Sequence, residues 1–115
     1  MSFMRRDPAY LLDILLAAQT AREFIAPLTW EESQASRLHQ QAIIKSLETV
    51  GEAAGQVSAA TRAELPELPW VEMIGMRHRL VHAYFDVDLR KVWDTVQQDL
   101  PHLIAVLERI VPPDQ

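Results

Sequence analysis

The sequence contains no cysteine. Disulfide bonds, thiolate metal sites and cysteine nucleophiles are therefore excluded, and the composition is compatible with a reducing cytosol. A continuous apolar run long enough to span a bilayer is also missing, and the basic start at Arg5 and Arg6 is not followed by the apolar core of a signal peptide. We expect a cytoplasmic protein with no part in the membrane.

The sequence also lacks the excess of basic residues that a broad basic surface would need. The 115 residues include 11 lysines and arginines against 16 acidic side chains, which gives a formal net charge of −5. This balance argues against non-specific attachment to nucleic acid, so any RNA would have to be held by a locally positive site. The same charge is equally compatible with a basic partner protein.

Strand-like alternation, repeats and low-complexity segments are absent as well. Instead, apolar residues recur at helical spacing in four stretches, at about 8–26, 30–57, 69–86 and 89–110. These amphipathic stretches predict an all-α, up-and-down four-helix bundle, formed by a single domain over residues 1–115. Pro101 should kink or break the last helix, and Asp99 is available to cap its restart.

Local signals mark the ends of the helices. Asp7, followed by proline, is typical of an N-cap, and Thr29 with Glu32 matches a capping box. Gly51 and Gly55 lie inside the second helix, where each destabilises by about 1 kcal/mol relative to alanine. Two explanations remain open: close approach of a neighbouring helix, from this chain or another subunit, or tolerated weak points.

The residues suited to chemistry are concentrated between positions 76 and 88. Arg77, His78, Arg79, His82 and Tyr84 supply phosphate-binding cations, proton carriers and an aromatic hydroxyl. On a helix Arg77 and Tyr84 share a face, whereas His82 lies about 140° from Arg77. A two-fold dimer would bring the same segment of a second chain across a cleft and so complete a site.

The same residues also have ordinary structural interpretations. Arginines and histidines near a helix end are most often solvated charges or partners of the helix dipole, and a tyrosine is most often a core ring. His78, His82 and Asp86, at i, i+4 and i+8, form a rival stripe of metal ligands. The lack of cysteine and the position of Asp86 near the helix end argue against it, so we expect no metal.

The motif Arg77-x4-His82-x-Tyr84 and its surroundings resemble the HepT-like branch of the HEPN superfamily. The resemblance extends over nearly the whole chain. It includes the segments 10–14, 51–54, 68–76, 85–88, 92–93 and 99–101. The chain departs from the family at His78, because the residue after the motif arginine is commonly asparagine.

This resemblance implies a helical homodimer in which two Arg/His motifs line a shared cleft. It further implies a cytoplasmic endoribonuclease that needs no metal or other cofactor and serves as the toxin of a toxin–antitoxin pair. The partner would be a minimal nucleotidyltransferase (MNT) antitoxin, which silences the toxin by transferring AMP to the motif tyrosine, here Tyr84.

In RNA cleavage the substrate's own 2′-hydroxyl would attack the adjacent phosphate. Arg77 would hold the phosphate, and His82 would transfer a proton because imidazole exchanges protons near neutral pH. His78, Arg79 and Tyr84 would contact the RNA. Two alternatives stay open, a non-catalytic module that binds a nucleotide or partner and the inhibitory subunit of a nucleotidyltransferase pair.

Overall fold

The computed structural model describes residues 6–111, with Tyr84 described by its backbone alone. Within these residues the chain forms helices and connecting turns without a strand, so the predicted all-α class is confirmed. The elements are α1 (Asp7–Ile25), α2 (Trp30–Ala35), α3 (Arg37–Gln56), α4 (Ala59–Glu64), α5 (Trp70–His82), the 3₁₀ turn η1 (Tyr84–Asp86), α6 (Leu89–Asp94), the π-helical turn η2 (Thr95–Asp99) and α7 (Leu100–Ile110).

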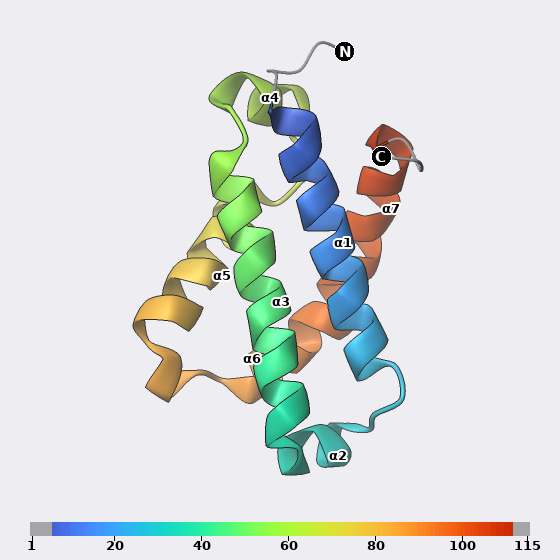
Figure 1. Ribbon diagram of the computed structural model, residues 1–115, viewed down its shortest axis with the longest axis vertical. Helices are drawn as coiled ribbons and strands as arrows, with labels where there is room; N and C mark the ends of the chain where they lie inside the picture. Colours follow the sequence, from blue (N-terminus) through green and yellow to red (C-terminus); the bar gives the residue numbers. More distant parts are fainter. Residues whose placement is uncertain (1–5, 112–115) are drawn as a thin grey trace.

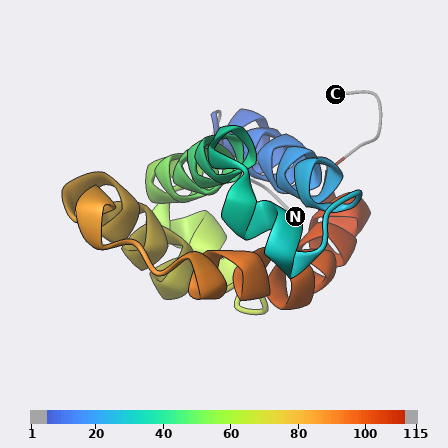
Figure 2. The ribbon, with the colours of Figure 1, turned by 90° about the horizontal axis from the view of Figure 1, so that it is seen from below.

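The longer helices alternate in direction along the chain (Figure 1). Helix α1 packs against α3 and α7, and α3 packs against α5 on its other side. Figure 2 shows that α5 and η1 consequently lie at one edge of the molecule, beyond α3. Buried apolar side chains from α1, α3, α5, α6 and α7 form one core cluster.

The second predicted helix is interrupted, which corrects the expectation of one helix from Thr29 to Val57. The predicted capping box is present: the Glu32 amide donates to Thr29 Oγ1 at 3.1 Å, and the Thr29 amide donates to Glu32 Oε1 at 2.9 Å. However, α2 ends at Ala35, and the next residue, Ser36, has an extended backbone and a hydroxyl that accepts the amide of His39. A serine inside the apolar periodicity therefore starts a second helix, α3.

Asp7 has a different role from the predicted N-cap of α1. It is the first residue of α1, and its buried carboxylate accepts hydrogen bonds from the Ser58 amide and hydroxyl and from the Thr61 hydroxyl. Ser58 itself caps α4, a short helix that the sequence pattern did not indicate. Asp7 thus ties the start of α1 to the segment that follows α3.

The last helix is irregular directly before Pro101. The amide of Leu100 donates to the carbonyl of Thr95, five residues back, which is the spacing of a π-helix. The Val96 carbonyl instead accepts a hydrogen bond from Arg22 of α1 at 3.3 Å, and the same Arg22 nitrogen donates to the Gln97 side chain at 2.7 Å. Asp99 makes no side-chain cap hydrogen bond, so the predicted restart occurs without it.

None of the helices in the described part of the chain is both long and apolar enough to cross a membrane.

Candidate active site

The candidate residues lie on α5 and η1, and the beginning of α5 is held by Trp70. The Trp70 indole N–H donates to the Leu65 carbonyl at 2.9 Å, and the Arg62 guanidinium lies 5.9 Å from the ring centre. Arg62 also donates to the Val57 and Gly55 carbonyls at the end of α3. These contacts fix the starting point of α5 relative to α3.

Gly51 brings the backbones of α3 and α5 together beside Arg77. A Cβ atom at position 51 would lie 2.3 Å from the Arg77 Cβ and 2.6 Å from the Met73 carbonyl oxygen. Only a glycine avoids these overlaps, so the predicted close approach is confirmed at Gly51, with a helix of the same chain. Gly55 has open space where a Cβ would be, so it does not share this role.

The Arg77 side chain is half-buried, and its Nε is a buried donor. Within the described residues this nitrogen has no hydrogen-bond partner. Buried N–H groups in proteins are nearly always paired, because an unpaired one destabilises by about 1–3 kcal/mol. A donor left open in this position is suited to an anionic ligand.

His78 and His82 lie together on the outward face of α5. Their ring centres are 4.5 Å apart with the ring planes inclined by 44°, and both residues are exposed. Asp86 lies beyond α5, in η1, and the described residues contain no group of three histidine or acidic side chains that could hold a metal. The rival three-ligand metal stripe is therefore not assembled.

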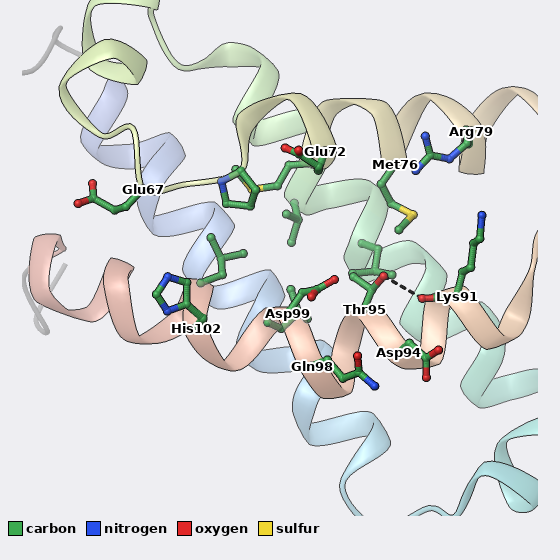
Figure 3. Close-up of a pocket in the computed structure, with 16 residues that line it drawn as sticks. Glu67, Glu72, Met76, Arg79, Lys91, Asp94, Thr95, Gln98, Asp99 and His102 are labelled. Carbon is green, nitrogen blue, oxygen red and sulfur yellow. Dashed lines mark hydrogen bonds between the residues drawn. The ribbon is translucent and has the colours of Figure 1, made fainter.

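Arg79 points to another side of α5, where a groove of about 610 Å³ separates α5 from α6, η2 and α7. Figure 3 shows Arg79 and Lys91 at one end of this groove, and Glu67 and His102 at the other. No local sequence pattern indicates this groove, because its walls come from several separate segments of the chain between Leu47 and Leu103. Its floor is apolar and includes Leu47, Val50, Met73, Met76, Leu100 and Leu103.

The structure thus distributes the predicted site residues over three sides of α5 and the turn that follows. Arg77 faces α3, the histidine pair faces outward, and Arg79 faces the groove. No hydrogen bond joins Arg77 to His82 in the described region, as the angle of about 140° between them predicts. Tyr84 begins η1, in which the Asp86 amide donates to the Ala83 carbonyl at 2.9 Å; the Tyr84 side chain lies outside the described part.

Comparison with known families decides the class of this site. The model of the family described as "Ribonuclease HepT-like" matches residues 14–110. The chain belongs to this family. The predicted membership is therefore confirmed, and with it the expectation of an enzyme of a ribonuclease family.

Two relatives with ribonuclease names are similar to this chain over almost its full length. "Probable ribonuclease HepT" of Thermococcus cleftensis is 39% identical over 106 residues, which are 92% of this chain and 96% of the relative. "Putative RNase MJ1380" of Methanocaldococcus jannaschii is 35% identical over 105 residues, 90% of this chain and 96% of the relative. No solved structure matches the chain with significance.

Proposed function

We propose that this HepT-like protein is an endoribonuclease that works without a metal ion, through Arg77 and His82, as the toxin of a toxin–antitoxin pair. The observation that carries the proposal is the buried, open Nε donor of Arg77, at a point where Gly51 fixes the backbone. His82 adds an exposed imidazole five residues later on the same helix.

In the proposed reaction the RNA supplies the nucleophile. The 2′-hydroxyl oxygen attacks the adjacent phosphorus as its proton is removed, the bond to the 5′-oxygen breaks, and that oxygen receives a proton. The products are a 2′,3′-cyclic phosphate and a 5′-hydroxyl end. Arg77 donates two hydrogen bonds to the phosphate as charge builds on it, and His82 transfers a proton.

A homodimer completes this site. Arg77 and His82 lie on different sides of α5, so one chain does not direct both at one phosphate. The outward face of α5 carries the exposed side chains of Val71 and Val81 beside the histidine pair. Two copies that meet across this face would cover the valines and bring the motif segments of both chains to one cleft.

Regulation by an MNT antitoxin belongs to the same proposal. AMP on the Tyr84 hydroxyl would place a bulky anion next to the motif, where it would compete with RNA phosphate by occupancy and by charge. The position of Tyr84 in η1, two residues after the end of α5, supports this assignment because the turn projects from the exposed edge of the molecule (Figure 2).

The test is RNA cleavage by purified, AMP-free protein in EDTA. We expect wild type to cleave and His82→Ala to lose about 10²–10⁴ in rate, because a general acid–base is removed. His102→Ala is the matched control, since it removes an exposed histidine of α7 outside the motif. Equal cleavage by wild type and His82→Ala, or no cleavage by folded wild type, contradicts the proposal.

A further inference from the structure

The adjacent histidines of α5 have a geometry that the proposed cleavage reaction does not require. Only His82 has a role in proton transfer, yet the His78 ring lies directly beside it, with 4.5 Å between ring centres. Both rings are on the outward face, and both residues are exposed in the single chain. In the proposed dimer they lie beside a cleft that must admit RNA, so a small ion can enter it as well.

The separation of the two rings matches that of two imidazoles bound to one metal ion. An ion about 2.1 Å from a nitrogen of each ring lies about 3.2 Å from each ring centre. If the two nitrogens subtend an angle of roughly 90–110° at the ion, the ring centres are about 4.5–5.2 Å apart. The observed 4.5 Å falls at the lower end of this range, so the two rings are close enough for one ion to bind a nitrogen of each.

We propose that His78 and His82 chelate a divalent transition-metal ion, with water in the remaining positions, and that this ion inhibits RNA cleavage. Imidazole is a good ligand for zinc, nickel and copper. The ion takes the nitrogen electron pair with which His82 accepts a proton, so a protein with the ion bound cannot use His82 as a base. The inhibitory part rests on the proposed ribonuclease function, whereas metal binding does not.

Binding is tested directly by calorimetric titration of untagged, metal-free protein with Zn²⁺ and with Cu²⁺. We expect one ion per chain and tighter binding of Cu²⁺ than of Zn²⁺. His78→Asn and His82→Asn should each weaken binding by more than about tenfold, because loss of even an outer-shell partner has an effect of that size. His102→Asn should bind as wild type does.

The proposed site is wrong if wild type binds neither ion. It is also wrong if His102→Asn loses metal binding while His78→Asn retains it. This readout needs no enzymatic activity, so it stands even if the ribonuclease proposal fails.

Inhibition is tested by measuring each protein's RNA cleavage in Zn²⁺ relative to its own rate in EDTA. Wild type should be inhibited by Zn²⁺, and His78→Asn, which retains His82, should require more than about tenfold more Zn²⁺ for the same inhibition. Mg²⁺ at the same concentration should have no such effect, because it prefers oxygen ligands. Equal sensitivity of wild type and His78→Asn, or equal inhibition by Mg²⁺, overturns the inhibitory role.

Discussion

Arg77 has a backbone that is held in place by a neighbouring helix and a side-chain nitrogen that has no hydrogen-bond partner in the described residues. Its Cα and Cβ lie against Gly51, so the residue cannot shift along α3. Its Nε is buried without a partner in the described residues. Such a group is organised before any ligand arrives, which lowers the entropy lost when a phosphate binds.

Replacing Arg77 with lysine tests the need for the guanidinium. Arg77→Lys keeps the positive charge but removes the planar pair of donors that matches a phosphate. We expect the cleavage rate to fall on the order of 10²-fold, as for the loss of one transition-state donor. Arg37→Lys, an exposed arginine at the start of α3, is the matched control. A single-turnover assay of both variants would contradict the role of Arg77 if their rates were equal.

At this scale the sequence indicated which residue types carry the chemistry but not their surroundings. Arg77, His82 and Tyr84 lie within eight residues of one another, so their clustering is visible in the sequence. Arg77 lies against Gly51 of α3, 26 residues earlier, and in the sequence only the glycine itself indicated that a neighbouring helix comes close. The groove beside Arg79 depends on still more distant segments.

The two glycines of α3 differ in what surrounds them, and they form a natural pair for comparison. Gly51→Ala places a methyl group against the backbone of α5, whereas Gly55→Ala places it in open space. Both changes gain up to about 1 kcal/mol of helix propensity. Only Gly51→Ala also overpacks an interface, which destabilises by about 1–3 kcal/mol.

We therefore expect opposite signs in urea unfolding at equal protein concentration. Gly55→Ala should raise the free energy of unfolding by up to about 1 kcal/mol. Gly51→Ala should lower it by about 1–2 kcal/mol and should also reduce RNA cleavage, because the base of Arg77 moves. If Gly51→Ala were as stable as Gly55→Ala, the close contact between α3 and α5 would be wrong.

Element boundaries were predictable where the signal is local. The capping box at Thr29 and the cap at Asp88, whose carboxylate accepts the Arg90 and Lys91 amides, use neighbours within three residues. The start of α4 was missed although its cap is local, with the Ser58 hydroxyl accepting the Thr61 amide, because a helix of six residues is too short to show apolar periodicity. The break at Ser36 was missed because apolar periodicity continues across it.

The Asp7 carboxylate should therefore contribute strongly to stability. Asp7→Ala removes the acceptor of three hydrogen bonds and leaves the buried Thr61 hydroxyl without it. We expect a loss of about 2–3 kcal/mol in the free energy of unfolding. Asp13→Ala, at an exposed position of the same helix, should stay within about 0.5 kcal/mol of wild type. Equal stability of the two variants in urea titrations would contradict this role.

The molecule as a whole is flat, with extents of 45 × 29 × 19 Å, and α5 occupies one edge (Figure 2). One side of α5 faces α3 and the core, and the opposite side exposes Val71 with the histidine pair. This exposed face is the basis for expecting a dimer, and it also places the proposed zinc site near the proposed cleft.

A charge at Val71 should separate the proposed dimer. Val71 is 81% exposed in the single chain, so Val71→Lys should leave the fold intact while burying an unpaired cation in the dimer interface. Sedimentation equilibrium should show dimeric wild type and a dissociation constant raised by more than about tenfold in the variant. Leu38→Lys, at a site 77% exposed on α3, is the control. If wild type is monomeric, or if Val71→Lys dimerises equally well, the proposed interface is wrong.

The π turn at Thr95–Asp99 contains one residue more than the α-helical turn that would span the same length. Deleting one residue of 97–99 would therefore restore α-helical spacing without reversing the faces of α6 and α7. The Val96 carbonyl would stay free of the helix even then, because the residue four positions after it would be Pro101, which has no N–H, so Arg22 would keep the acceptor that links α1 to it. In alignments of this family, the arginine at position 22 should accordingly be lost together with the proline at position 101, because any other residue there has an N–H to donate to the Val96 carbonyl.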